Sequence, residues 1–261
     1  MTLVKHELRQ GRSALAIWTA AIGFLVIVCV FLFPEMKGEM DGISDMFASM
    51  GSFTQAFGMD RLNFGTLIGF YAVECGNILG LGGAFFASLI AVTALSKEEK
   101  DRTSEFLLTH PVCRARIVTE KLAAVMIRIV LLNGLVFVVS VGSMAFIGEE
   151  IPWREVGLLH LAYFLLQVEL AGLCFGISAF LRRSSMGIGL GVAAMMYFLN
   201  LIANLTKQAK FLKYITPFGC AEGADIISSG RLDVPMVVLG MVFTAAGIAA
   251  AYGKYLNKDI Q

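Results

Sequence analysis

The chain has 261 residues, of which 57% are hydrophobic and 16% are charged, and its net charge is +1. A mean hydropathy of +0.75 is too high for a soluble domain of this size and is typical of a protein that crosses a membrane several times. The basic residues are spread along the chain instead of clustering with aromatic ones, which excludes a nucleic-acid-binding surface. The five cysteines are widely spaced and form no CxxC pair or His/Cys cluster, so we expect no metal site.

Six segments are apolar over the roughly 20 residues that a membrane-spanning helix needs, and they predict an all-α protein with six transmembrane helices. The predicted spans are 14–33, 67–95, 122–147, 157–181, 186–206 and 235–254. The first span follows a basic start, as in a secretory signal peptide, but it is too long for one and no small-residue cleavage site ends it. We therefore expect it to remain as part of a single transmembrane domain, 1–261.

The basic residues also predict the orientation of the chain. Six spans place both termini on one side of the membrane, where thirteen lysines and arginines fall, against seven on the other side. Because cytoplasmic loops are enriched in these residues, we expect both termini in the cytoplasm. The segments 34–66 and 207–234 then face outward. Hydrophobic residues recur every three or four positions between 36 and 57, which predicts an amphipathic helix on the outer leaflet.

The loop 96–121 is the one sizeable cytoplasmic connection, and it carries the signals of a short amphipathic helix. Ser96 and Glu99 have the spacing of a capping box. The sequence FLL at 106–108 forms an apolar tip, and Pro111 ends the helix because proline disfavours a helical conformation in the residue before it. This order of signals favours a helix that docks on a partner protein. The alternative is a solvated hairpin whose charges only fix the orientation.

The sequence TSEFLLTHPVCRARI at 103–117 resembles the coupling-helix signature of permease subunits of type 2 ATP-binding-cassette exporters, the ABC-2 class. The matching residues are Thr103, Glu105, Leu107, Leu108, Pro111, Val112 and Arg114. Arg102 stands where the family usually has glycine, and Cys113 stands where it usually has serine. The segment 3–12 resembles the family's amphipathic elbow helix, and 56–71 and 212–230 resemble outer stretches of bacterial members.

The resemblance implies a half-transporter in the plasma membrane of a bacterium. It would have an elbow helix at 1–13, a coupling helix between the second and third spans, and a second permease subunit, identical or related, as its partner in the lipid. A separate cytoplasmic ATPase would bind ATP and Mg, because this chain has no GxxxxGK[ST] phosphate-binding motif. We therefore expect no catalytic residue and no bound cofactor in the chain itself. The residues implied in coupling to the ATPase are Glu99, Arg102, Thr103, Glu105, Phe106, Leu107, Leu108, Pro111 and Arg114.

Three ionisable side chains within the predicted spans are candidates either for the translocation path or for buried polar contacts, since such groups are costly in lipid. Glu74 lies near the outer interface, and Arg128 lies about 10 Å inside its span, where its long side chain reaches the headgroups. Glu169 lies about 18 Å deep, near the midplane. It either forms a buried pair, with Arg128 or Asn133 as partner, or lines the path, and both interpretations stay open.

Two other classes of function remain as alternatives to an exporter. An intramembrane enzyme would have to use Glu74, Glu169 and His160, which form no paired catalytic motif. An ATP-independent transporter or channel would need more polar groups at the midplane or a visible repeat. Asn200 and Asn204 are only weak candidates for the path, because single amides often serve to join helices. The substrate, the direction of transport and the choice between a homodimer and a heterodimer stay open.

Overall fold

The computed structural model describes residues 2–38, 51–97, 113–181 and 185–257. Within these ranges every regular element is a helix, and six helices are long and apolar enough to cross a membrane. They are α1 (Thr2–Gly38), α4 (Leu67–Val92), α7 (Arg114–Phe146), α8 (Trp153–Ser178), α9 (Met186–Leu205) and α11 (Val234–Leu256). The prediction of an all-α polytopic membrane protein is confirmed.

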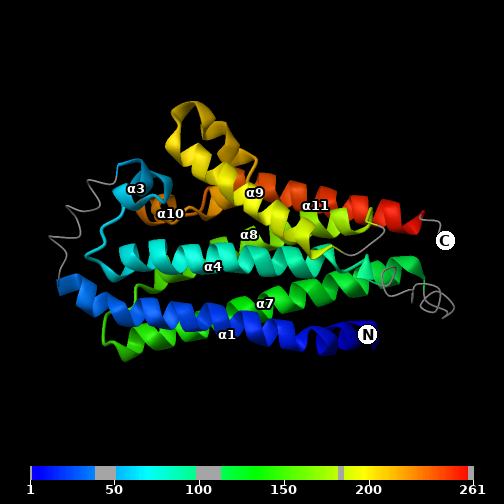
Figure 1. Ribbon diagram of the computed structural model, residues 1–261, viewed down its shortest axis with the longest axis horizontal. Coiled ribbons are helices and arrows are strands. Elements are labelled where there is room, and N and C mark those ends of the chain that lie inside the picture. Colours follow the sequence, from blue (N-terminus) through cyan, green and yellow to red (C-terminus); the bar gives the residue numbers. More distant parts are fainter. Residues whose placement is uncertain (1, 39–50, 98–112, 182–184, 258–261) are drawn as a thin grey trace.

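The long helices lie side by side, with α4 and α8 in the centre (Figure 1). The pair α1 and α7 packs on one side of this centre, and α9 and α11 cover the other side. The start of α1 and the end of α11 lie at the same end of the bundle, which we call the terminal end. We call the opposite end the distal end.

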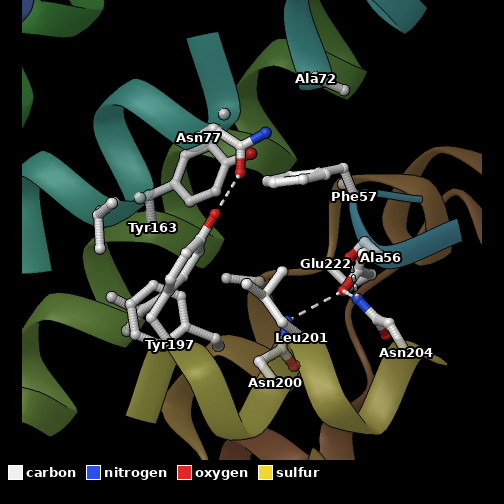
Figure 2. Close-up of a pocket in the computed structure, with 17 residues that line it drawn as sticks. Ala56, Phe57, Ala72, Asn77, Tyr163, Tyr197, Asn200, Leu201, Asn204 and Glu222 are labelled. Carbon is white, nitrogen blue, oxygen red and sulfur yellow. Dashed lines mark hydrogen bonds between the residues drawn. The ribbon is translucent and has the colours of Figure 1, made fainter. Parts of the chain in front are cut away.

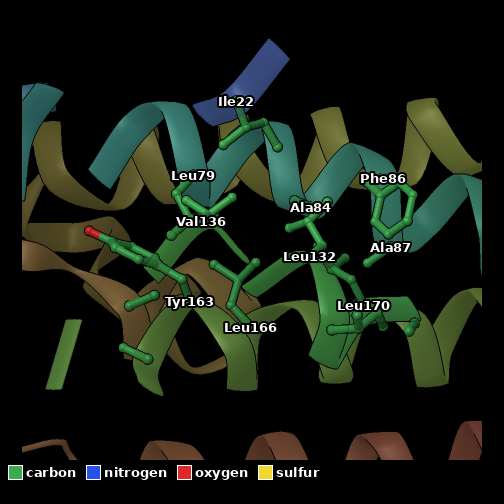
Figure 3. Packing of buried hydrophobic residues seen from close by; sticks show 14 of the residues in the cluster. Ile22, Leu79, Ala84, Phe86, Ala87, Leu132, Val136, Tyr163, Leu166 and Leu170 are labelled. Carbon is green, nitrogen blue, oxygen red and sulfur yellow. The ribbon is translucent and has the colours of Figure 1, made fainter. Parts of the chain in front are cut away.

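Apolar side chains fill the space between these helices (Figure 3). Leu79 of α4, Leu132 of α7 and Leu166 of α8 are among the buried residues that meet there. The outward faces of the four flanking helices are also apolar, because Phe24, Val138, Phe198 and Val238 are exposed. Such faces suit lipid or another membrane subunit.

Helix caps account for where two spans begin at the distal end. The hydroxyl of Thr66 accepts a hydrogen bond from the amide of Gly69 at 3.2 Å, at the start of α4. The carboxylate of Asp233 accepts one from the amide of Met236 at 3.3 Å, and Pro235 occupies the first turn of α11. Both caps satisfy amides that have no partner within their own helix.

Glycines let α8 and α11 approach each other closely. A Cβ atom added to Gly247 would lie 2.5 Å from the carbonyl oxygen of Gly172, and one added to Gly176 would lie 2.7 Å from the carbonyl oxygen of Gly247. Backbone therefore packs directly on backbone along this interface. Small residues have this role in many membrane helix pairs, where the hydrophobic effect does not drive association.

Helix α1 is a single continuous element, and this corrects the prediction of a separate elbow at 1–13. Its 37 residues make about 55 Å at 1.5 Å per residue, far more than a hydrocarbon core of about 30 Å requires. Helix α7 has 33 residues and is similarly long. The first turns of α1 continue the helix axis because polar contacts with α7, described below, hold them there.

Short helices form the distal end. They are α3 (Ser52–Ala56), η1 (Met59–Arg61), η2 (Lys207–Tyr214), η3 (Pro217–Ala221) and α10 (Gly223–Ser229). Much of the amphipathic helix expected between 36 and 57 falls on 39–50, outside the described residues. Asp225 joins three of the short helices, because its carboxylate accepts hydrogen bonds from the guanidinium of Arg61 and, at 3.1 Å, from Nζ of Lys213.

The first prediction tests the backbone contact of α8 with α11. Gly247→Leu is expected to lower the free energy of unfolding by about 2 kcal/mol or more, because the interface has no room for a side chain. Gly253→Leu on the same helix is the matched control, since nothing lies within 4 Å of a Cβ at that position. The thermal unfolding midpoint in detergent measures both. An equal midpoint for the two variants would contradict the close packing.

The second prediction concerns the pH dependence of the distal end. Burial favours the neutral form of Asp225, but the charges of Lys213 and Arg61 outweigh it and hold its pKa below the usual 3.8. Since the folded-state pKa is lowered, the ion pairs stabilise the fold fully above that pH and lose their effect as the pH falls through the lower folded-state value. Asp225→Asn should therefore lower the unfolding midpoint at pH 6, and the difference from wild type should shrink below about pH 3.8.

The control for this experiment is Glu150→Gln, which removes an exposed carboxylate at the same end of the bundle. Its difference from wild type should be small at every pH, because isolated surface charges contribute little to stability. If the difference in unfolding midpoint between Asp225→Asn and wild type stayed constant down to pH 3, the carboxylate would not titrate as described.

Candidate functional site

Most of the predicted coupling residues lie outside the described residues. These are Glu99, Arg102, Thr103, Glu105, Phe106, Leu107, Leu108 and Pro111. The structure describes the two stems of their loop, which are the end of α4 and the start of α7. Arg114 belongs to the second stem, where its Nη1 donates a hydrogen bond to the carbonyl oxygen of Leu256 at 3.1 Å.

The first stem ends with a buried serine. Ser96 is fully buried, and its hydroxyl donates a hydrogen bond to the carbonyl oxygen of Val92 at 3.0 Å. This bond runs back into the last turn of α4. The hydroxyl thus satisfies a carbonyl at the end of one span. The predicted capping box would instead have the hydroxyl accept a hydrogen bond from a backbone amide at the start of a new helix. Glu99, the other member of that box, lies outside the described residues.

Lys121, in the second stem, joins three helices. Its Nζ donates to Oε1 of Glu7 in α1 at 3.1 Å and to the carbonyl oxygen of Ala94, just past α4, at 2.8 Å. The lysine side chain is only 1% exposed. A carbonyl at the end of a helix has no partner within the helix and lies at the negative end of the helix dipole, so a cation there is favourable.

Arg128 contacts the same glutamate from about two turns further along α7. Its Nη2 donates to the carbonyl oxygen of Glu7 and lies 3.5 Å from Oε2 of that residue. Gly11 provides the space, because a Cβ atom there would lie 2.5 Å from Cζ of Arg128. The guanidinium is nine-tenths buried. The prediction that Arg128 reaches the lipid headgroups is therefore wrong.

Glu120 holds the very start of α1. Its Oε2 accepts hydrogen bonds from the amides of Leu3 and Val4 at 3.1 and 3.3 Å, and its Oε1 accepts one from Nε of Arg116 at 2.8 Å. A carboxylate at a helix N-terminus satisfies free amides and complements the helix dipole. One helix thus caps another. We call Glu7, Ala94, Glu120, Lys121 and Arg128 the Lys121 junction.

Sequence reasoning missed the Lys121 junction, although one signal for it exists. Leu3, Glu7 and Gly11 are spaced by four residues, so they share one face of a helix. A carboxylate between an apolar residue and a glycine on one face is typical of a packed surface, whereas the elbow interpretation placed this segment flat on the membrane. A cavity of about 40 Å³ lies beside Lys121 and Arg128, with room for water.

Glu169 contacts neither of its expected partners. Arg128 is bound to Glu7, and Nδ2 of Asn133 donates to Oε1 of Gln167 at 2.7 Å. The carboxyl of Glu169 faces α11 instead, where a Cβ atom on Gly240 would lie 2.2 Å from its Oε2. It is 5% exposed and makes no hydrogen bond or ion pair with another described residue.

The asparagines of α9 meet a carboxylate near the distal end (Figure 2). The Nδ2 atoms of Asn204 and Asn200 lie 2.9 and 3.3 Å from Oε2 of Glu222, which follows η3. Arg61 balances this charge, with its Nη2 3.8 Å from Oε1. Sequence reasoning missed Glu222 because it assigned 207–234 to the outer surface. Nothing in the sequence shows that this segment folds back against α9.

These residues line a pocket among α3, α4, α8, α9 and η3, with a cavity volume of about 50 Å³. Tyr163 and Tyr197 lie on its other side, and the hydroxyl of Tyr197 points to Oδ1 of Asn77 at 3.5 Å (Figure 2). Oδ1 of Asn200 is buried and has no partner in the described part of the chain. The pocket can therefore hold a few water molecules or a small polar group that donates a hydrogen bond. Glu74 lies outside it, half-buried on α4.

The third prediction contrasts the two buried glutamates. Glu222→Gln should lower the free energy of unfolding by about 2 kcal/mol, because the carboxylate accepts two amide hydrogen bonds and faces a guanidinium. Glu169→Gln should leave stability unchanged or raise it slightly, because a neutral amide of the same shape costs less to bury. Thermal unfolding in detergent at neutral pH measures both variants. A large loss of stability for Glu169→Gln would show that this carboxylate has a charged partner.

Comparison with protein families gives a match over nearly the whole chain. The family model described as ABC-2 family transporter protein matches residues 1–259, which include all six long helices and both stems of the loop 96–121. A search of curated proteins found no match. Because the family model covers nearly the whole chain, the protein belongs to the ABC-2 family of transporter proteins.

Proposed function

We propose that the chain is the membrane-spanning permease subunit of an ATP-driven exporter, and that the loop 96–121 couples it to a separate ATPase. Membership of the ABC-2 family carries this proposal. The topology supports the assignment of the loop. Two connections between long helices lie at the terminal end, and the one between α4 and α7 is much longer than the one between α8 and α9.

The terminal end faces the cytoplasm in this proposal, since most of the lysines and arginines outside the spans lie there. The ATPase binds ATP and Mg, and a second permease subunit, identical or related, completes the transporter in the plasma membrane of a bacterium. The exposed apolar faces of the flanking helices are available to this subunit and to lipid.

We assign the path to the side of the bundle that contains the pocket, where Asn200, Asn204 and Glu222 present polar atoms. Glu169 we assign to the packing of α8 on α11, because its carboxyl faces Gly240 and is buried within the subunit. The alternative of an intramembrane enzyme gains no support from the geometry. Nε2 of His160 lies 2.8 Å from the hydroxyl of Tyr71, which also donates to Ser140, and neither glutamate of the spans takes part.

The fourth prediction tests the docking role of the loop. Leu107→Asp should weaken binding of the ATPase at least about 10-fold, because a charge would enter an apolar contact at a cost of 1.4 kcal/mol or more. The measurement is the amount of ATPase that co-purifies with the chain and its rate of ATP hydrolysis. Leu107→Met, which keeps the apolar character, is the control and should bind normally.

The thermal unfolding midpoint of the isolated Leu107→Asp chain should equal that of wild type, which separates lost docking from lost folding. If the complex and its hydrolysis rate both survive this change, the loop is not the docking element.

A further inference from the structure

Lys121 is a buried lysine near the start of α7. It lies in the third turn of α7, after the buried Ile117 and Val118, and its ammonium lies among protein atoms with 1% of the side chain exposed. A buried ammonium is unfavourable unless hydrogen bonds and an opposite charge compensate for the lost water. Glu7 and the carbonyl oxygen of Ala94 supply both. The lysine therefore connects the two stems of the loop to each other and to α1.

The contact with α1 is made at successive levels of the helix. Glu120 caps its first turn, Lys121 binds the side chain of Glu7, and Arg128 binds the carbonyl oxygen of the same residue. Gly11 allows the guanidinium to lie against the next turn. The first three turns of α1 are thus held to α7 by polar contacts, whereas further along the two helices meet through apolar side chains such as Phe31 and Phe146, whose ring centroids lie 5.3 Å apart.

We propose that the Lys121 junction makes α1 and the two stems move as one body, so that a displacement of the loop reaches α1. The proposal rests on the docking role of the loop given above. Its physical basis is that separating a buried ion pair leaves an uncompensated charge, which is far more costly than shifting packed helices together. Lys121 is accordingly a positioning residue that acts through Glu7.

The first arm of the test uses the chain alone and does not depend on an ATPase. Glu7→Gln, Lys121→Met and the double variant form a thermodynamic cycle, measured by thermal unfolding in detergent. Each single variant should have a lower thermal unfolding midpoint than wild type. The midpoint of the double variant should be no lower than that of the less stable single variant. Lys5→Met removes an exposed lysine from the same end of α1 and should leave the midpoint unchanged. Additive effects in the cycle would overturn the junction.

The second arm measures hydrogen exchange in the complex with the ATPase, with and without a nonhydrolysable ATP analogue. In wild type, the nucleotide should change the exchange of peptides covering 3–12 and 113–121. In Lys121→Met the change at 113–121 should persist, while the change at 3–12 should be lost. Lys121→Arg, which keeps the charge, should restore it. A purely structural role would not separate the two peptides in this way.

The outcomes distinguish this inference from the proposed function. If Lys121→Met does not fold, Glu7→Gln replaces it in the second arm, since that change keeps the shape of the side chain. If wild type forms the complex and α1 responds equally in the variants, or does not respond in wild type, the inference is wrong. If no ATPase binds wild type, the proposed function fails. The thermodynamic cycle then decides whether the junction exists. The inference that movement of the loop reaches α1 would be wrong as well, because it requires an ATPase bound to the loop.

Discussion

The structure depends on one carboxylate, that of Glu7, which lies between the charged groups of Lys121 and Arg128. A buried charge is costly unless an opposite charge and hydrogen bonds compensate for the lost water, so these groups favour the arrangement in which the three helices meet. The first turns of α1 lie along α7, where the carboxylate of Glu7 meets Lys121 and Arg128. The end of α4 lies where the carbonyl oxygen of Ala94 meets the same ammonium.

Helix α7 repeats this arrangement along its length. Its buried residues include two polar pairs, Lys121 with Arg128 and Asn133 with Ser140; the members of each pair are seven residues apart, close to two helical turns, and so share a face. Each of these contacts another helix: Asn133 pairs with Gln167 of α8, and Ser140 accepts a hydrogen bond from Tyr71 of α4. Apolar packing alone would allow many rotations of α7 about its axis. The polar partners select one, because any other would leave buried groups unsatisfied.

The sequence allowed the six spans to be predicted because length and apolar character are local properties. The partners of polar residues could not be predicted, because they depend on which helix faces which. The elbow was wrong for this reason: the amphipathic pattern of 3–12 suits a membrane surface and a packed helix equally. Glu222 was missed because nothing local shows that its segment folds back against α9. Asn200 and Asn204 were named from the sequence only as weak candidates for the path, and their contact with Glu222 could not be predicted, because it depends on how the segment after α9 folds.

The unbroken length of α1 has a consequence for how the two ends of the bundle communicate. A continuous helix of about 55 Å can act as a lever, and each degree of tilt about its midpoint moves its ends by about half an ångström in opposite directions. At the distal end α1 packs on its neighbours through the ring of Phe33 against Phe70 of α4 and the ring of Phe31 against Phe146 of α7, beside the exposed ion pair of Lys37 with Glu149. A tilt imposed at the terminal end would therefore be passed to α4 and α7 at the distal end through apolar packing, without any chain of polar contacts along the bundle.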